Sequence, residues 1–117
     1  MEPGKSARAI RNVPATLDVF DSHFERFPVL PGVLVLGSLA ELAGMLMKET
    51  TGSEWRLRTA TRVRFKSYVR PGDQLELSVS INLREEARAE LQGTVKVGDQ
   101  VVVTATRLAL SVVGPPS

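Results

Sequence analysis

Residues 32–49 read GVLVLGSLAELAGMLMKE and form most of the longest apolar stretch in the chain. Pro31 precedes this segment, good helix formers fill it, and Thr50-Thr51-Gly52 follows it, so it predicts one long helix. Apolar residues lie on nearly every side of that helix, which is typical of a helix that is covered on most sides. Glycines and Glu41 interrupt the stretch, which is too short for a membrane span. We therefore expect a buried helix in a soluble protein.

The sequence after Gly52 predicts β-structure throughout. Apolar and polar residues alternate in three segments, and a fourth segment is apolar on both faces along much of its length. These four predicted strands are residues 55–66, 75–83, 87–97 and 101–113. Residues 70–73 and 97–100 have the composition of tight turns. Before the helix, Ser6–Val13 predicts a short strand, and residues 14–31 predict irregular backbone.

This order of elements predicts an α+β fold in which one long helix covers one apolar face of an antiparallel sheet of about five strands. Such a sheet cannot enclose a helix that is apolar nearly all round. We therefore expect a second copy of the chain to cover the rest, which makes the protein a homodimer.

The composition is that of one globular domain over residues 1–117. Hydrophobic residues make up 43% of the chain and charged residues 24%, which excludes a disordered polypeptide. The absence of cysteine excludes disulfides and a cysteine nucleophile, and it fits a cytoplasmic protein. The net charge of +2 is too small to indicate nucleic-acid binding. With one histidine and no cysteine, we expect no metal site and no cofactor.

Three features of the sequence could carry chemistry. His23 is the only side chain that changes charge near neutral pH, so it is either a general base or a surface histidine. Glu41 is the only ionisable residue between Arg26 and Lys48. Burial would favour its protonated carboxyl, which suits a general acid, whereas a bonded Glu41 would only hold the fold. Gly32 begins the helix, where backbone N–H groups favour a partial negative charge.

The segment HFERFPVLPGVL, residues 23–34, resembles the active-site stretch of the 3-hydroxyacyl-acyl-carrier-protein dehydratases. In that family, phenylalanine follows the histidine, a proline comes five residues on, and Pro-Gly-Val starts eight residues on. Residues 4–13 and 65–75 resemble the family's strand before the histidine loop and its strand–turn–strand with a Pro-Gly-Asp turn. The resemblance covers roughly residues 4–113. It implies a hotdog fold, a dimer with the active site at its interface, and a thioester substrate on an acyl carrier protein or CoA.

The sequence departs from the family at two places. The family has an extra N-terminal helix and strand, so this chain is expected to be a shortened form. The family's catalytic acid lies fourteen residues after the histidine, a position that Gly37 occupies here. Four residues further on, where the family commonly has glutamine, this chain has Glu41, one helical turn away on the same face.

Three functions follow from these residues. In the first, a dehydratase of fatty-acid or polyketide-type synthesis, His23 removes the α-proton, Glu41 protonates the leaving hydroxyl and the Gly32 N–H holds the thioester oxygen. In the second, a thioesterase, Glu41 acts as base or nucleophile. In the third, a non-catalytic partner subunit, the chain binds the acyl carrier without turnover. The residues expected to contact substrate are Phe24, Pro31, Val33 and Gly37.

Basic residues lie in the first predicted strand after the helix and in the turn that follows it. They predict a surface that binds an acidic carrier protein. These residues are Arg56, Arg58, Arg62, Arg64, Lys66 and Arg70. Most of them are as readily explained as a solvated strand face. Arg26 and Arg70 are the two expected nearest to the histidine loop, so they are the candidates for carrier binding.

Overall fold

The computed structural model describes residues 1–13 and 32–113, which form one helix and five strands. The elements are β1 (Ser6–Asn12), α2 (Gly32–Thr51), β2 (Trp55–Phe65), β3 (Gln74–Arg84), β4 (Arg88–Val97) and β5 (Gln100–Val112). Each matches a predicted element to within two residues at either end. The prediction of one helix between a first strand and four later strands is therefore confirmed.

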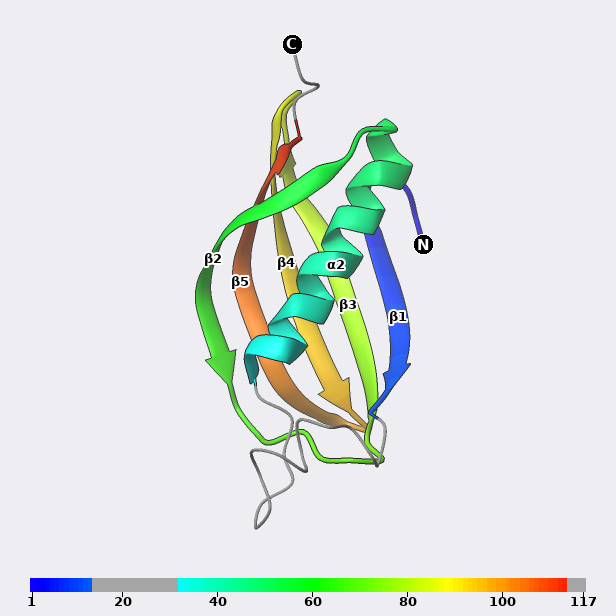
Figure 1. Ribbon diagram of the computed structural model, residues 1–117, viewed down its shortest axis with the longest axis vertical. Coiled ribbons are helices and arrows are strands. Elements are labelled where there is room, and N and C mark those ends of the chain that lie inside the picture. Colours follow the sequence, from blue (N-terminus) through cyan, green and yellow to red (C-terminus); the bar gives the residue numbers. More distant parts are fainter. Residues whose placement is uncertain (14–31, 114–117) are drawn as a thin grey trace.

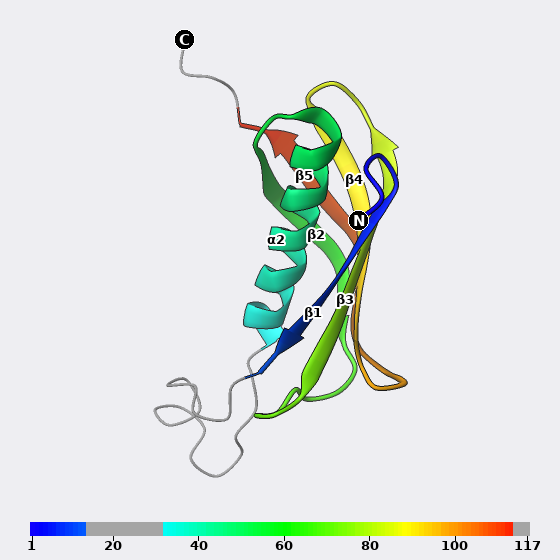
Figure 2. The same cartoon turned by 90° about the vertical axis from the view of Figure 1, so that its right-hand side faces the viewer.

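The five strands form one antiparallel sheet with the order β1-β3-β4-β5-β2. Helix α2 lies across one face of this sheet, and the side view shows it on that one side (Figures 1 and 2). The helix approaches β4 closely at Gly93, where an added Cβ would lie 3.2 Å from the side chain of Leu39. The expected α+β arrangement, with a helix over the apolar face of the sheet, is confirmed.

The core lies between the inner face of α2 and the sheet. The largest fully buried side chains include Leu39, Leu46 and Met47 from the helix and Leu75, Leu91 and Leu108 from the strands. On the helix, the buried positions repeat at spacings of three and four residues, as expected for one face of an α-helix. Burial of this face is what orients α2, and with it every residue on the opposite face.

Replacing Leu39 with alanine should lower the free energy of unfolding by about 2–5 kcal/mol, because the side chain is fully buried and the change leaves a cavity. Urea or guanidinium denaturation followed by tryptophan fluorescence measures this loss. Leu83→Ala is the matched control from strand β3, where the side chain is 41% exposed. It should change stability by less than about 0.5 kcal/mol. Equal losses in the two variants would contradict the packing described here.

The outer face of α2 remains uncovered in the single chain. Leu34 and Met45 are 47% and 53% exposed, although both are large apolar side chains. One sheet therefore covers only one side of this largely apolar helix, as the sequence indicated. Within residues 1–13 and 32–113, no helix is both long enough and apolar enough to cross a membrane.

Strand β2 departs from the alternation that the sequence suggested. After the buried Trp55, its inward positions are Leu57, Ala60 and Val63. These three are spaced by three residues, because the pairing with β5 shifts between residues 57 and 59 and Arg62 has a φ of 53°. Strict alternation through residues 55–65 would put Phe65 on the apolar face with Trp55 and Leu57, but its side chain is 52% exposed. The arginines of this strand are nevertheless exposed, as expected of a basic face.

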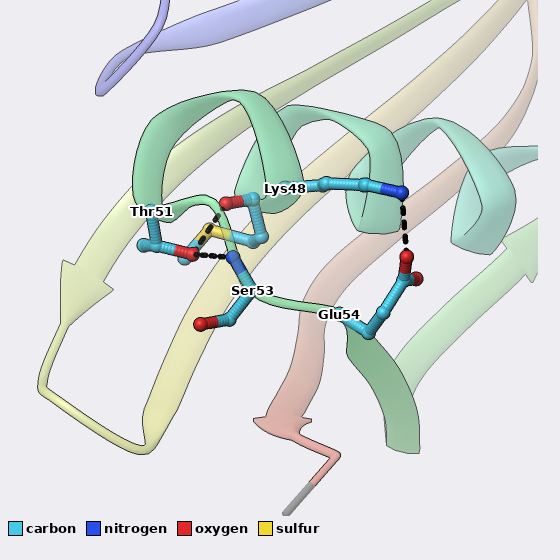
Figure 3. A network of polar contacts seen from close by, with 5 residues as sticks. Lys48, Thr51, Ser53 and Glu54 are labelled. Carbon is cyan, nitrogen blue, oxygen red and sulfur yellow. Dashed lines mark hydrogen bonds and ion pairs between the residues drawn. The ribbon is translucent and has the colours of Figure 1, made fainter. Parts of the chain in front are cut away.

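The end of α2 is fixed by a set of polar contacts (Figure 3). The Thr51 hydroxyl donates to the Met47 carbonyl at 2.8 Å and accepts from the Ser53 N–H and the Trp55 indole N–H. Lys48 Nζ lies 2.6 Å from Glu54 Oε1, and this hydrogen bond and charge raise the pKa of Lys48. These contacts end the helix where the chain turns into β2.

Candidate functional site

A groove runs between β1 and α2 on the β1 side of the helix. Its volume is about 230 Å³. The lining residues are Ala9, Ile10 and Arg11 from β1, Ser38, Glu41, Leu42 and Met45 from α2, and Leu77 from β3. Leu42 and Leu77 are 5% and 3% exposed, whereas Arg11 and Glu41 are largely exposed. The groove therefore has an apolar floor and a partly polar rim.

Arg11, Ser38 and Glu41 form a polar cluster at one end of this groove. Arg11 Nη1 donates to Ser38 Oγ at 2.7 Å and lies 3.7 Å from Glu41 Oε2. Ser38 Oγ also lies 3.4 Å from the carbonyl oxygen of Leu34, one turn earlier in the helix. A single guanidinium thus ties strand β1 to two side chains of α2 and holds the Glu41 carboxyl beside the groove.

Glu41 is exposed in the single chain, so this chain's own described residues do not supply the burial that the acid role was predicted to need. Its side chain is 67% exposed, and its partner Arg11 is 57% exposed. The reason is its place on the helix, because Leu34, Gly37 and Met45 share its outward side while the buried residues face the sheet. Solvent surrounds this carboxyl unless something else covers the outer face of α2.

Gly37 lies on the same exposed face, one turn before Glu41. A Cβ added at residue 37 would have no heavy atom within 4 Å among the atoms described. The position at which the sequence resemblance implies an acid therefore faces open space among the described atoms of this chain. Within residues 1–13 and 32–113, no three His, Asp or Glu side chains are grouped to hold a metal ion.

The predicted helix start is confirmed, because α2 begins at Gly32. The first N–H groups of a helix have no partner in an earlier turn. The predicted contact between the Gly32 N–H and the thioester oxygen requires such a free N–H group. The side chain of Val33 is not described. The other predicted residues of this segment, His23, Phe24, Arg26 and Pro31, lie outside the described residues.

The chain leaves β1 and enters α2 at the same end of the molecule (Figure 1). Val13, the last described residue before this segment, is fixed to the turn that precedes β3. Its N–H donates to the Asp73 carbonyl at 2.9 Å, and its carbonyl accepts from the Gly72 N–H at 2.8 Å. The two described residues that flank segment 14–31, Val13 and Gly32, therefore both lie at this end of the molecule.

Arg70 belongs to this same turn and is exposed. Its backbone N–H donates to Asp73 Oδ2 at 2.8 Å, which leaves its guanidinium free of that contact. The structure thus brings one of the two predicted carrier-binding arginines beside the start of segment 14–31. The basic residues of β2 lie at the other edge of the sheet, because β1 and β2 are the two edge strands.

Sequence reasoning missed Arg11, Ser38 and Met45. The sequence did contain a sign that Arg11 faces the helix. Ala7, Ala9 and Arg11 occupy every second position of β1, and the two alanines pack against the core. An arginine at the end of an inward-facing series is unusual and points to a partner on the helix. Its contact with Ser38 joins residues 27 positions apart, which no local pattern reveals.

Comparison with known proteins relates the chain to dehydratases. The family described as ApeI-like, ApeI dehydratase, matches residues 1–106. The 3-hydroxyacyl-acyl-carrier-protein dehydratase FabZ of Thermoanaerobacter sp. (strain X514) is 41% identical over 108 residues, which are 90% of this chain and 76% of that protein. FabZ of Listeria monocytogenes serovar 1/2a is 36% identical over 116 residues, which are 95% of this chain and 80% of that protein.

Solved structures share the fold at lower identity. The fluoroacetyl-CoA thioesterase FlK superposes with a TM-score of 0.77 at 17% identity, over 97% of this chain and 88% of that one. An acyl-CoA hydrolase from Staphylococcus aureus in complex with butyryl coenzyme A gives a TM-score of 0.72 at 14% identity, over 93% and 63%. These likenesses confirm the predicted hotdog fold.

Proposed function

The chain belongs to the ApeI-like dehydratase family and is similar to FabZ, and on that premise we propose that it removes water from a 3-hydroxyacyl thioester. The acyl group is carried on an acyl carrier protein or on CoA, and the pathway is of the fatty-acid or polyketide type. The setting is the cytoplasm, and no cofactor takes part. The family match supports this function more strongly than any other observation.

The proposed reaction uses three groups from this chain. His23 removes the α-proton, and the backbone N–H at Gly32 stabilises the negative charge that develops on the thioester oxygen. The C–O bond at the β-carbon breaks, a double bond forms between the α- and β-carbons, and Glu41 gives its proton to the departing hydroxyl to make water. His23 then holds one extra proton and Glu41 lacks one, and exchange with solvent resets both. Phe24, Pro31, Val33 and Gly37 surround the substrate.

The observation that carries the role of Glu41 is its position beside a groove on the helix that starts at Gly32. Because Glu41 is 67% exposed in the single chain, the acid role requires a cover over the outer face of α2. A second copy of the chain is the proposed cover, since Leu34 and Met45 leave apolar surface on either side of Glu41. The homodimer is therefore part of the proposal.

A thioesterase is the second candidate, and the contact between Arg11 and Glu41 favours it. A carboxylate beside a guanidinium is suited to activate water or to attack the acyl carbon, either of which would release the thiol. The absence of a carboxyl at Gly37 favours the third candidate, a partner subunit that binds acyl carrier without turnover.

One pair of assays separates the three functions. The purified protein is mixed with an enoyl-pantetheine thioester, and loss of the conjugated thioester absorbance is followed beside the appearance of free thiol. Hydration without thiol release is the expected result, since dehydration is reversible. Thiol release alone would support the thioesterase, and binding of acyl carrier protein without either reaction would support the partner subunit. Size-exclusion chromatography with light scattering tests the dimer in the same preparation.

The carrier surface gives a separate prediction. Arg70→Glu should lower kcat/KM for a carrier-bound substrate by about tenfold at low salt, because an acidic carrier would meet a repulsive charge beside segment 14–31. The same variant should leave kcat/KM for a pantetheine substrate unchanged. Arg84→Glu, at the far end of β3, changes the net charge equally and is the control. Equal effects of the two variants would contradict a local docking role for Arg70. Arg26→Glu tests the second predicted carrier-binding residue in the same way.

A further inference from the structure

We propose that Arg11 is a positioning residue, which holds the Glu41 carboxyl in place for the reaction with the help of Ser38. The chemistry assigned to Glu41 is that of the proposed function, on which this role of Arg11 rests. Arg11 makes no contact with the substrate in this proposal, because its task is to fix another side chain. The contacts that support the role all lie within the described residues of β1 and α2.

The Glu41 side chain needs a partner that holds it, because the helix alone does not. It is 67% exposed and lies on the outward face of α2, away from the packed core. An exposed glutamate has several rotatable bonds and samples many rotamers. Catalysis requires one orientation, since a displacement of about 1 Å can cost roughly 100-fold in rate. Among the residues that the structure describes, Arg11 alone forms an ion pair with Glu41.

The sheet fixes the backbone of Arg11. Strand β1 pairs with β3 over its full length, and Arg11 lies opposite Leu75, which is 1% exposed. Side chains alternate along a strand, so Arg11 and Ala9 share the face toward the helix, while Arg8 lies on the other face. The guanidinium therefore extends toward α2 from a fixed point of the fold.

Ser38 fixes the far end of the Arg11 side chain. The Ser38 hydroxyl donates to the Leu34 carbonyl at 3.4 Å, which leaves its oxygen to accept a second hydrogen bond. Arg11 Nη1 donates to that oxygen at 2.7 Å. The same Nη1 lies 3.7 Å from Glu41 Oε2, which is close enough for an ion pair but too far for a hydrogen bond. Arg11 therefore attracts the carboxylate without occupying a hydrogen-bonding position of Oε2.

This arrangement suits a carboxyl that gives a proton in one direction of the reaction and takes it back in the other. In dehydration, the O–H bond of Glu41 breaks and its proton passes to the departing hydroxyl, which leaves as water. In hydration, the carboxylate takes a proton from the attacking water, so it must face the β-carbon in both directions. A hydrogen bond from Arg11 to Oε2 would compete with that proton, whereas the ion pair at 3.7 Å does not.

The test is a double-mutant cycle measured by hydration of an enoyl-pantetheine thioester. Arg11→Met removes the charge but keeps a long side chain, and it is made in the wild-type protein and in Glu41→Gln. Ser38→Ala removes the hydrogen bond to Arg11 but keeps the charge, and it is made in the same two backgrounds. Arg8→Met is the matched control, because Arg8 is an exposed arginine on the opposite face of the same strand. Thermal melts verify that each variant is folded.

Arg11→Met should lower kcat by roughly 10- to 100-fold and change KM by less than about twofold, because the carboxyl remains but loses its orientation. Ser38→Ala should lower kcat by a smaller factor. In the Glu41→Gln background, each of these changes should cost less than about twofold, and Arg8→Met should cost no more in either background. Arg11→Lys keeps the charge and a donor, so it should recover part of the loss.

Three results would overturn the role of Arg11. They are an unchanged kcat in Arg11→Met, an equal loss in Arg8→Met, and a loss in Arg11→Met that is the same with Glu41 and with glutamine at residue 41. The last result would mean that Arg11 acts independently of Glu41.

Free thiol is measured in the same samples, which separates the role of Arg11 from the proposed function. Hydration by the wild-type protein without coupling between Arg11 and Glu41 would refute only the positioning role. Thiol release without hydration, with coupling of the two residues in that rate, would refute the dehydratase while Arg11 still positions Glu41. Absence of both reactions would overturn the positioning role together with the proposed function.

Discussion

Replacing His23 with alanine is expected to slow hydration of an enoyl thioester by roughly 10²–10⁴-fold, the usual contribution of a positioned general acid or base. The loss should appear in kcat, with KM changed little, because the imidazole takes part in proton transfer and only weakly in substrate binding. Steady-state kinetics with a pantetheine substrate measure the effect without the carrier protein. His23→Gln is the companion variant, since it keeps a polar side chain but cannot shuttle the proton.

The outcome for His23 also separates the proposed functions. A thioesterase that relies on Glu41 would keep its rate of thiol release when His23 is replaced. Full hydration activity in both His23 variants would exclude the imidazole from the reaction, and it would leave the dehydratase proposal without its base. Thermal melts of the variants should match the wild-type protein if the residue serves chemistry and not packing.

The second large effect is expected at residues 37 and 41. Glu41→Gln should lower hydration by roughly 10²–10⁴-fold if this carboxyl supplies the proton to the leaving group. Adding Gly37→Glu to that variant places the acid and the glutamine at the positions that the sequence resemblance implies for the dehydratase family. The added side chain meets open space, so it should be accepted without rearrangement. We expect the double variant to regain at least about tenfold in kcat.

The control for this experiment is Gly37→Gln in the Glu41→Gln background. It adds the same bulk and the same helix-favouring side chain, worth up to about 1 kcal/mol relative to glycine, but it has no acid. Recovery with glutamate and not with glutamine would show that the carboxyl position matters. Unchanged activity of Glu41→Gln alone would remove Glu41 from the mechanism and leave it as the partner of Arg11.

Most of the fold could be predicted because its elements have strong local signals. The apolar segment at residues 32–49, the turn at residues 70–73 and the turn at residues 97–100 each determine their own structure, and the strands between them follow. Strand β2 was the exception. The register shift against β5 and the positive φ of Arg62 bring Ala60 to the inner face, which strict alternation between Leu57 and Val63 does not predict.

The site was harder to predict because it depends on which side of α2 faces the sheet. With apolar residues on nearly all sides of the helix, the sequence does not distinguish a buried Glu41 from an exposed one. Packing makes the choice, since Leu39, Leu46 and Met47 fill the core and leave Glu41 on the opposite side. The contact of Arg11 with Ser38 and Glu41 then follows from the placement of β1 beside the helix.

The hydrogen bonds between Val13 and the turn at Gly72 and Asp73 have a consequence for engineering. These bonds hold Val13, which precedes segment 14–31, to the turn before β3. Gly32, which follows the segment, is the first residue of α2. The segment that contains His23 thus joins two fixed points of the fold and can be exchanged as a unit. Grafting the corresponding segment from another dehydratase should alter selectivity while the melting temperature stays set by the scaffold.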